Sequence, residues 1–592
     1  MAVNAKYIHS NPAIYSLRAF AGEELCRHVE LAEYTINQYM QEILADIYNR
    51  RPDVIGFSCY IWNWGLVREL LVEIPKLLPD AELWLGGPEV SYDADVIIKD
   101  FPMLAGIMVG EGEGTFRELL SYYVKRGVRQ DSGNMSEDAP VELREIKGLC
   151  LPSGYTPARL LTDMGGIPFL YHDLTPFENK IIYYETSRGC PYRCGYCLSS
   201  LDKTVRFRDM DIVQRELQFF LDHRVKQVKF VDRTFNCSHT HAMAIWRYIH
   251  EHDNGVTNFH FEISADILRE DEIALLNCFR PGLAQLEIGV QSVNPQTLQA
   301  IRRTMDLEKL EKAVEAVRRG GNVHQHLDLI AGLPFEGYES FRESFNRVYR
   351  MGPQQLQLGF LKLLKGSELW ERAEEYGIRY LTRPPYEVLY TKWLTYGEML
   401  RLKRIEEMLE IYYNSAQFSH TMAFMEKAFP DAFSMYEALA DFYARKGYSM
   451  SGPARVYRYH ALLQFALEYD PARRDVYREL LTYDMYLREN VKTRPEFAPD
   501  LSCWKDFSRE FYRREERERV FLPDYGGYDW KQLAKMTHLE PFTYPVWDRA
   551  EMADGYECFG NGGGGECGFV LFDYQKRNPL NYEARTYRVG IG

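Results

Sequence analysis

The segment TSRGCPYRCGYC at residues 186–197 places three cysteines within eight residues, and it decides how the rest of the chain is interpreted. Thiolates are the preferred protein ligands of iron–sulfur clusters. Three neighbouring thiolates can hold three irons of a cubic 4Fe–4S cluster and leave the fourth iron open to another molecule. We therefore predict Cys190, Cys194 and Cys197 as ligands of such a cluster. The alternative is a structural zinc site, which needs four ligands, and here only Cys237 or a distant histidine would supply the fourth.

The cysteine loop directly follows an apolar segment, Ile181–Thr186, that begins a regular alternation of strand and helix patterns. Helical patterns such as Asp211–Asp222 and Asp306–Arg319 separate the strands. Further strands are predicted at Gln227–Asp232, Asn258–Ser264, Ala284–Val290, His324–Ile330 and Gln355–Leu361. Six such repeats predict an α/β fold with a parallel barrel or partial TIM barrel, and they place the cysteine loop at its mouth. We assign this domain to residues 181–375.

The cysteine spacing, the aromatic residue before the last cysteine and the preceding strand together resemble the radical S-adenosylmethionine (SAM) superfamily. In that family the open iron chelates SAM, and electron transfer from the cluster cleaves SAM to a 5′-deoxyadenosyl radical. The resemblance implies an electron donor such as flavodoxin or ferredoxin, and a reducing, cytoplasmic location. It also implies SAM contacts at motifs on successive strand ends. Those residues are Tyr196, Asp232, Ser264, Gln291, Arg303 and Gly332.

Residues 1–130 alternate helical and strand patterns that predict a doubly wound, Rossmann-like parallel sheet. Strands are expected at Asp53–Tyr60, Glu82–Gly86 and Ile107–Gly110, and helices at Tyr15–Leu31, Ile36–Asn49, Leu66–Leu78 and Thr115–Lys125. Only Met1, Ala2 and Val3 precede Asn4, so the first strand is either very short or trimmed. Sheets of this kind bind ligands beyond the carboxyl ends of their strands.

Two glycine turns end strands of this first domain, Gly86-Gly87-Pro88-Glu89 and Gly110-Glu111-Gly112-Glu113. Standing ahead of a radical SAM barrel, they resemble the cobalamin-binding domain of the cobalamin-dependent radical SAM class. The resemblance implies cobalamin contacts from both turns and from two other strand-end loops. The residues in question are Asn4, Tyr7, Ser58, Tyr60, Gly86, Gly87, Pro88, Glu89, Gly110, Glu111, Gly112 and Glu113.

Several motifs that would change this interpretation do not occur in the sequence. It has no GxGxxG and no P-loop GxxxxGK[ST], which argues against a nucleotide site. It also has no DxHxxG, the motif whose histidine binds cobalt from below in many cobalamin proteins. Proteins with this pairing of domains generally lack that motif as well, so its absence leaves cobalamin binding open. A domain that has kept the fold and lost the ligand is the alternative.

The remaining segments are a linker at residues 131–180 and a C-terminal region at residues 376–592. The linker is rich in Gly, Pro, Ser and Asp. The C-terminal region shows helical patterns at Leu394–Ala416, Ala432–Arg445, Ala454–Glu468 and Arg474–Arg488, then a glycine-rich, strand-like tail from Phe521. It resembles the uncharacterised C-terminal domain of one subgroup of this class, and we expect a mostly α accessory or substrate domain. Cys558 and Cys567 flank a glycine-rich run. Two interpretations are kept for this segment: the cysteines are ligands of a second cluster, or the run is a simple glycine turn.

Composition limits the partners of the chain. The formal net charge of −14 over 592 residues disfavours general binding to nucleic acid, which needs a surplus of Lys and Arg. No segment approaches the roughly 20 apolar residues that span a bilayer, so we expect no membrane partner. The N-terminus lacks the apolar core of a signal peptide.

The resemblance favours a cobalamin-dependent radical SAM methyltransferase that carries a methyl group from methylcobalamin to an unactivated carbon of an unknown substrate. One alternative keeps both cofactors but catalyses a rearrangement, cyclisation or ring contraction. Another is a non-catalytic cobalamin carrier or sensor. A tRNA methylthiotransferase is disfavoured, because its extra cluster cysteines would have to be Cys26, Cys59 and Cys150, which do not stand clearly at strand ends.

Overall fold

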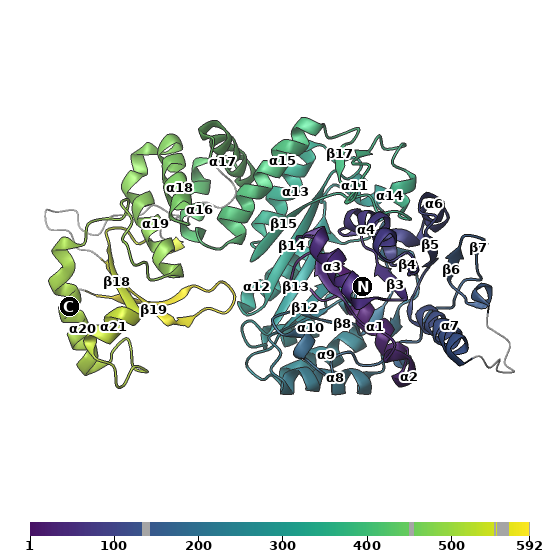
Figure 1. Cartoon of the computed structure of the whole chain (residues 1–592). Coiled ribbons are helices and arrows are strands. Elements are labelled where there is room, and N and C mark those ends of the chain that lie inside the picture. The colour runs from purple at the N-terminus through teal and green to yellow at the C-terminus, as the bar shows by residue number, and fades with distance from the viewer. Residues whose placement is uncertain (133–141, 449–454, 550–551, 553–567, 591–592) are drawn as a thin grey trace. The chain divides into compact units, whose positions relative to one another are not determined.

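A computed structural model of the chain describes residues 1–132, 142–448, 455–549, 552 and 568–590. The chain divides into two compact units. The first comprises Met1–Gly320, Gly332–Gly337 and Phe360–Thr395. The second comprises Gly321–Ala331, Tyr338–Gly359 and Tyr396–Gly592. Each unit is described by itself (Figure 1).

The first unit opens with a seven-stranded sheet in the order β2-β1-β3-β4-β5-β6-β7. Five neighbouring strands run parallel, and β6 and β7 extend the β5 edge as antiparallel strands. The bounds are β1 Ala2–Asn4, β2 Glu33–Thr35, β3 Val54–Ser58, β4 Glu82–Gly86, β5 Leu104–Met108, β6 Leu149–Leu151 and β7 Gly154–Tyr155. This arrangement confirms the predicted doubly wound domain.

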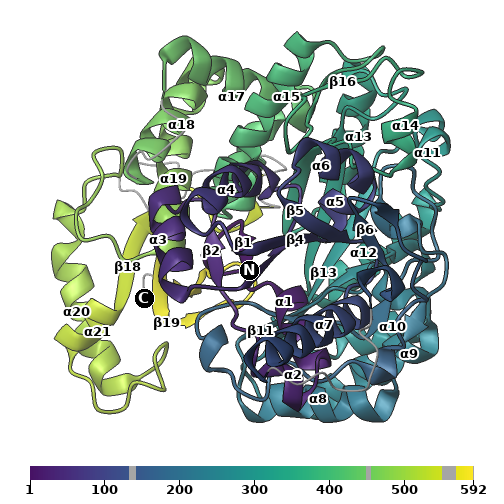
Figure 2. The ribbon, with the colours of Figure 1, turned by 45° about the vertical axis from the view of Figure 1, so that its right-hand side comes forward.

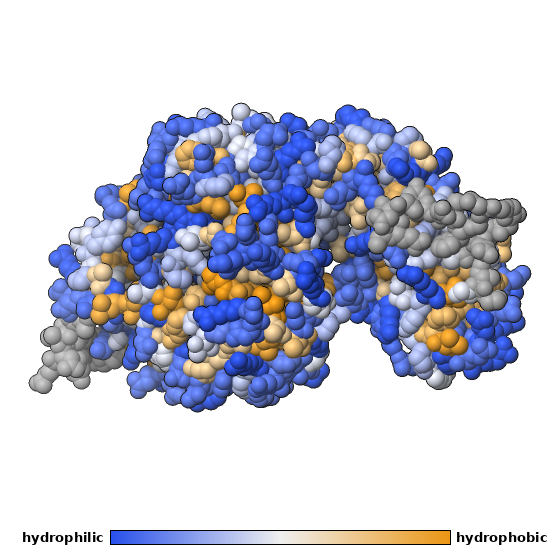
Figure 3. Space-filling model, turned by 180° about the vertical axis from the view of Figure 1, so that it is seen from behind, coloured by the Kyte–Doolittle hydropathy of each residue, from blue (hydrophilic) through white to orange (hydrophobic). Residues whose placement is uncertain are grey.

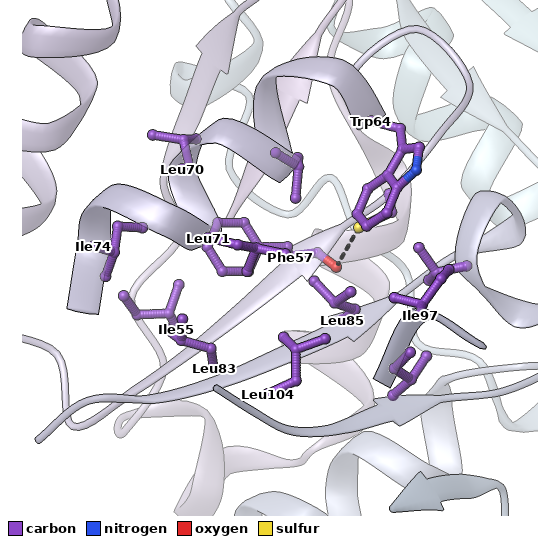
Figure 4. Close-up of a cluster of buried hydrophobic side chains, with 14 of the residues drawn as sticks. Ile55, Phe57, Trp64, Leu70, Leu71, Ile74, Leu83, Leu85, Ile97 and Leu104 are labelled. Atoms are coloured by element: carbon purple, nitrogen blue, oxygen red, sulfur yellow. Dashed lines mark hydrogen bonds between the residues drawn. The ribbon is translucent and has the colours of Figure 1, made fainter. Parts of the chain in front are cut away.

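Helices cover both faces of this sheet. On one face, α3 (Met40–Arg50), α4 (Trp64–Leu77), α5 (Pro88–Ser91) and α6 (Ala94–Asp100) bury their apolar sides against the strands. Figure 4 shows this core, in which Phe57 and Leu85 of the sheet meet Leu71 and neighbouring side chains of the helices. On the other face, α1 (Pro12–Phe20) and α7 (Glu113–Ser132) lie side by side (Figure 2), with the short α2 (Glu23–Cys26) next to them.

The first strand is three residues long, which agrees with the expectation of a very short strand. Its neighbour β2 was not predicted and lies between the helices expected at Tyr15–Leu31 and Ile36–Asn49. Two other local expectations need correction. The helix expected at Tyr15–Leu31 ends at Phe20, because Gly22 takes a positive φ of 82°. The range 131–180, expected to be a linker, supplies β6 and β7. Its glycine and proline content reflects a hairpin turn in which Gly154 has a φ of 118°.

A second parallel sheet in the first unit contains β8 (Ile182–Tyr184), β11 (Gln227–Phe230), β12 (Asn258–Ile263) and β13 (Ala284–Gln291) in that order. Four helices alternate with these strands along the chain. They are α8 (Met210–Asp222), α9 (His239–Glu251), α10 (Glu270–Asn277) and α12 (Leu307–Gly320). Every second strand residue packs on this helical layer, as Phe261 does against Trp246. All four strands agree with the predicted barrel strands to within two residues at either end.

The second unit contains the last two predicted barrel strands, β14 (His324–Ala331) and β15 (Gln355–Phe360), and the helix between them, α13 (Tyr338–Arg350). A mostly helical region follows, as expected. Its main elements are α15 Tyr396–Leu409, α16 Ser419–Met425, α17 Ala432–Lys446, α18 Arg455–Tyr469, α19 Arg474–Arg488, α20 Lys505–Glu518 and α21 Trp530–Met536. The tail forms an antiparallel sheet of β18 (Thr537–Phe542), β19 (Gly568–Arg577) and β20 (Ala584–Val589). Cys558 and Cys567 lie outside the described residues.

Polar residues dominate the face of the molecule shown in Figure 3, and hydrophobic residues form separate patches on it. Within the described ranges, no helix combines the length and the apolar character needed to cross a membrane.

Candidate functional site

The cysteine loop begins at a short hairpin beyond the end of β8. β9 (Ser187–Arg188) pairs with β10 (Arg206–Phe207) and brings the two ends of the loop together. Gly189 follows β9 with a φ of 100°, and a Cβ there would stand 2.1 Å from the carbonyl oxygen of Thr204. Only glycine therefore fits this position. The hairpin fixes where the chain enters and leaves the segment that carries the three cysteines.

Hydrogen bonds hold the middle of the loop. The Gly195 N–H donates to the Ile301 carbonyl at 2.8 Å, and the Leu369 N–H donates to the Gly195 carbonyl at 2.9 Å. Arg303 approaches Cys194, with Nη1 3.8 Å from Sγ. Cys190 and Cys194 are buried, and Cys197 is half-buried. Chain segments more than 100 residues downstream thus position a loop that carries buried thiols.

In the described part of the chain, no three Cys, His, Asp or Glu side chains converge closely enough to hold a metal ion. The structure therefore keeps the three thiols on one tethered loop without bringing them to a common point. Their chemistry still suits an iron–sulfur cluster, since the loop offers three thiols and no competing carboxylate or imidazole between Cys190 and Cys197. The assignment of these cysteines as cluster ligands remains a prediction.

Two predicted SAM residues carry buried polar atoms that have no partner among the described residues. These are Oε1 of Gln291, at the end of β13, and Nε of Arg303. Gln291 has a φ of 71°, so the strand turns sharply there. Arg303 also donates from Nη2 to the Gly289 carbonyl, which fixes the guanidinium beside Cys194. Unpartnered buried donors and acceptors are costly, and a polar ligand at this position would satisfy them.

Other predicted SAM residues are placed as follows. Tyr196 is half-buried, and burial is the main cause that raises the pKa of its hydroxyl, next to Cys194 and Arg303. Ser264 follows β12, where its N–H donates to Asn236 Oδ1 at 2.9 Å and its hydroxyl donates to Asp266 at 2.6 Å. Gly332 has a φ of 92°, the tight turn that the motif requires.

Asp232, predicted as a SAM contact, makes hydrogen bonds within the chain that the sequence did not reveal. Its carboxylate is fully buried and accepts three hydrogen bonds from the residues that open the cysteine segment. The donors are the Thr186 N–H at 3.0 Å, the Thr186 hydroxyl at 2.7 Å and the Ser187 hydroxyl at 2.5 Å. Burial raises the pKa of Asp232 to about 6, although these bonds oppose the shift. Asp232 anchors the start of the loop, because the pairing of β8 with β11 brings residue 232 beside residue 186.

A cavity of about 1360 Å³ lies against the first sheet and is lined also by α1 and α7. That volume exceeds the few hundred to 1,000 Å³ typical of drug-sized ligands. Nine of the twelve predicted cobalamin residues line it: Ser58, Tyr60, Gly86, Gly87, Pro88, Gly110, Glu111, Gly112 and Glu113. Gly56 also lines it, and a Cβ there or at Gly110 would meet nothing within 4 Å. Glycines therefore leave open a space that side chains would fill, which suits a large, flat cofactor.

The other three predicted cobalamin residues do not line this cavity. Asn4 donates to the His9 carbonyl and to Glu33, so its amide holds the loop after β1. Tyr7 is 70% exposed. Glu89 is buried and accepts a hydrogen bond from the Tyr386 hydroxyl at 2.6 Å. Burial raises the pKa of Glu89. The hydrogen bond from Tyr386 and the positive charge of Lys365 lower it, but burial has the larger effect.

Two arginines of the β9–β10 hairpin, Arg188 and Arg206, form ion pairs with the carboxylates of Glu111 and Glu113. Arg188 lies 2.9 Å from Glu113 and 3.5 Å from Glu111, and it also pairs with Glu185 at 2.8 Å. Arg206 lies 2.5 Å from Glu111. The pKa of Glu111 is lowered to about 2. Burial by itself would raise this pKa, but the hydrogen bonds from Arg206 and from the Thr162 N–H have the larger effect. The turn that lines the cavity is thus ion-paired to the two strands that flank the cysteine loop.

Sequence reasoning missed both arginines, although Arg188 stands two residues before Cys190. It also missed Trp62, whose ring stacks on Tyr60 with centroids 4.4 Å apart and whose indole N–H donates to the Val3 carbonyl. The signal available for Trp62 was its place just beyond a strand end. Neither its stacking partner nor the arginines' carboxylates could be identified without the fold.

Family models match three segments of the chain. The B12 binding domain matches residues 1–120, the Radical SAM superfamily matches residues 184–348, and a protein of unknown function (DUF4080) matches residues 374–557. The first two confirm the resemblance inferred from the motifs and imply a 4Fe–4S cluster, SAM and cobalamin as cofactors. The third corresponds to the uncharacterised C-terminal region.

Several curated proteins are similar to this chain. The cobalamin-dependent radical SAM methyltransferase TokK of Streptomyces tokunonensis is 26% identical over 362 residues, covering 57% of this chain and 51% of TokK. A 2-(S-pantetheinyl)-carbapenam-3-carboxylate methyltransferase of Streptantibioticus cattleyicolor is 27% identical, covering 53% and 47%. The hopanoid C-3 methylase of Methylococcus capsulatus is 24% identical, covering 56% and 62%. The chain spans about half the length of the first two relatives.

Solved structures share the fold. The cobalamin-dependent radical enzyme OxsB, with aqua-cobalamin and SAM bound, superposes with a TM-score of 0.56 at 14% identity, covering 81% of this chain and 80% of OxsB. The methyltransferase TsrM of Kitasatospora setae, with cobalamin and a 4Fe–4S cluster bound, gives 0.51 at 18% identity, covering 65% and 78%. By the family models, the chain carries a B12 binding domain, a Radical SAM domain and a DUF4080 domain, in that order.

Proposed function

We propose that this protein transfers a methyl group to an unactivated carbon of its substrate, as a cobalamin-dependent radical SAM methyltransferase. One observation carries the proposal. The glycine turn that lines the large cavity and the hairpin that begins the cysteine loop are joined by ion pairs of Arg188 and Arg206. A corrinoid site and a cluster site held together in this way suit a reaction that needs both cofactors at one substrate.

When bound, the cluster and SAM supply a 5′-deoxyadenosyl radical, and methylcobalamin supplies the methyl group. We assign the cluster to Cys190, Cys194 and Cys197. The Arg303 guanidinium, with an unpartnered Nε, suits the carboxylate of SAM, and the unpartnered Oε1 of Gln291 suits one of its donors. Binding there would orient SAM beside Cys194.

The remaining residues of the site position these groups. Asp232 fixes the start of the cysteine loop through Thr186 and Ser187. The hydrogen bonds of Gly195 fix its middle. The cavity floor at Gly56 and Gly110 leaves room for a corrin ring against the sheet. Preorganisation of this kind keeps reactive groups at a fixed separation without reorganisation during turnover.

Product analysis tests this function. The anaerobic protein, reconstituted with iron, sulfide and cobalamin, would be reduced by flavodoxin or ferredoxin, the donors expected in a reducing cytoplasm. We expect 5′-deoxyadenosine and S-adenosylhomocysteine to form together, and a substrate mass increased by one methylene. 5′-Deoxyadenosine with a changed substrate but no S-adenosylhomocysteine would contradict methyl transfer and favour a rearrangement, cyclisation or ring contraction. No reductive cleavage of SAM would favour a carrier or sensor.

A further inference from the structure

A row of polar side chains crosses the second sheet of the first unit on the face opposite its helices. Strand residues alternate between faces, and Phe230 lies on the helical side, where its ring packs on Phe261 and Phe261 packs on Trp246 of α9. Lys229, the neighbour of Phe230, therefore points the other way. The strand register places Tyr183, Lys229, His260 and Gln285 side by side, with Glu262 and Glu287 in the next row on the same face.

Three members of these rows form an ionic cluster. Glu287 Oε2 lies 3.0 Å from Lys229 Nζ and 2.9 Å from His260 Nε2. Burial raises the pKa of Glu287, but His260 and Lys229 outweigh it and lower the pKa to about 2, so the carboxylate stays ionised. The side chains of Lys229 and Glu287 are 25% and 23% exposed. This face is neither sealed nor apolar.

Such a face is unlike the interior of an ordinary barrel, which branched apolar side chains fill. Burying charges costs free energy, and an ion pair within a protein adds little net stability over apolar packing. Packing alone therefore does not explain three charged or ionisable residues on adjacent strands. A ligand that forms hydrogen bonds with these residues would explain why they are there.

The cluster lies near one predicted SAM residue, and the row that contains it contacts a loop of the B12-binding domain. Gly289, two residues beyond Glu287 on the same face of β13, accepts a hydrogen bond from Arg303, which approaches Cys194. The loop after β1 reaches the other end of the row, where His9 Nδ1 lies 2.6 Å from the Tyr183 hydroxyl. The polar row thus spans from the cysteine loop to a loop of the B12-binding domain.

We propose that this row is the substrate site, and that the substrate is a water-soluble molecule that presents a carboxylate or phosphate oxygen to Lys229. The inference rests on the proposed function. The Lys229 ammonium has three donors, and Glu287 takes one of them. Because Lys229 pairs with Glu287 at 3.0 Å, the charges of the two groups offset each other, and an anionic group would be held by the remaining N–H donors of Lys229.

Other cations near the row favour the same sign of charge. Arg233 follows β11, is exposed, and makes no ion pair among the described residues. Lys6 and Lys229 both act on His9, whose pKa is lowered first by burial and then by these two positive charges. Lys6 and Lys229 thus add positive charge at the end of the row that carries Tyr183, whereas Glu262 and Glu287 stand in the next row.

The test uses methyl-labelled SAM and the reconstituted full-length protein. The enzyme is incubated with a protein-free extract of its source organism, separated into an aqueous and a chloroform–methanol fraction. We expect label in an aqueous compound that an anion-exchange resin retains. Lys229→Met should lower that labelling about tenfold or more, since it removes a charge-assisted hydrogen bond. Lys229→Arg should retain most of it.

A matched control is the ion pair of Arg280 with Asp253 at 2.8 Å, which has similar exposure but holds the turn before β13. Arg280→Met should leave labelling of the extract unchanged. Wild-type iron content and 5′-deoxyadenosine formation in Lys229→Met would show that this variant is folded. Label only in the chloroform–methanol fraction, on a cationic compound, or unaffected by Lys229→Met would overturn the inference. Absence of label from every fraction, with 5′-deoxyadenosine formed, would instead contradict the proposed methyl transfer.

Discussion

Replacing Arg188 by glutamine removes one of the two cations that join the cavity turn to the cysteine hairpin. Arg188 is 22% exposed and Glu113 only 7%, at 2.9 Å. At an effective dielectric constant of about 20, their gross attraction is about 6 kcal/mol. Desolvation offsets most of it, and we expect a net coupling of about 2 kcal/mol. The loss of this coupling should also weaken cobalamin binding, because Glu113 belongs to the turn that lines the cavity.

A double-mutant cycle measures this coupling. The free energy of unfolding of the apo protein would be determined by denaturant titration for wild type, Arg188→Gln, Glu113→Gln and the double variant. The control cycle uses Arg126 and Glu82, which lie 2.7 Å apart but are 50% and 33% exposed. That exposed pair should give less than about 1 kcal/mol. Additive effects at Arg188 and Glu113, within about 0.5 kcal/mol, would refute the reasoning.

Three further substitutions test the site. Gly56→Val should leave stability within about 1 kcal/mol of wild type, because its side chain enters open space. It should raise the dissociation constant for hydroxocobalamin at least tenfold in an absorbance titration, and unchanged binding would place the corrinoid elsewhere. Gly189→Ala should lose most of the reconstituted iron, whereas Gly195→Ala, whose Cβ would have no neighbour closer than 3.7 Å, should keep it. Equal iron in both would refute the hairpin argument. Asp232→Asn should flatten the pH dependence of stability between pH 4 and 7. Burial raises the folded-state pKa from 3.8 to about 6, so stability from this group is complete below pH 4 and is lost as pH rises through 6, by up to about 3 kcal/mol. An identical pH profile in the variant would contradict this.

The barrel strands could be predicted closely because each is a short apolar run that the helices on one side bury. β2, β6 and β7 could not, since strands of two or three residues show no periodic pattern and depend on their neighbours in the sheet. The fold class and the position of the cysteine loop follow from local sequence. The extent of the first sheet follows from tertiary pairing.

Site residues divide in the same way. The glycine turns at residues 86–89 and 110–113 were identifiable because a Gly-rich turn after a strand is a local signal. The roles of Asp232 and Glu113 were not, because each depends on a partner from another element. Asp232 binds Thr186, 46 residues away, and Glu113 binds Arg188, 75 residues away. In the fold both carboxylates position loops, and their ligand contacts stay predictions.

The central claim is that one chain holds an iron–sulfur cluster through Cys190, Cys194 and Cys197 and a corrinoid in the cavity of its first domain. The direct measurement is metal and sulfide analysis, with the absorption spectrum, of protein reconstituted anaerobically with cobalamin. We predict about four iron and four sulfide atoms per chain together with about one cobalt. The variant with all three cysteines changed to alanine should lose the iron and keep the cobalt. Iron retained in that variant, or no cobalt bound by the wild-type protein, would contradict the account.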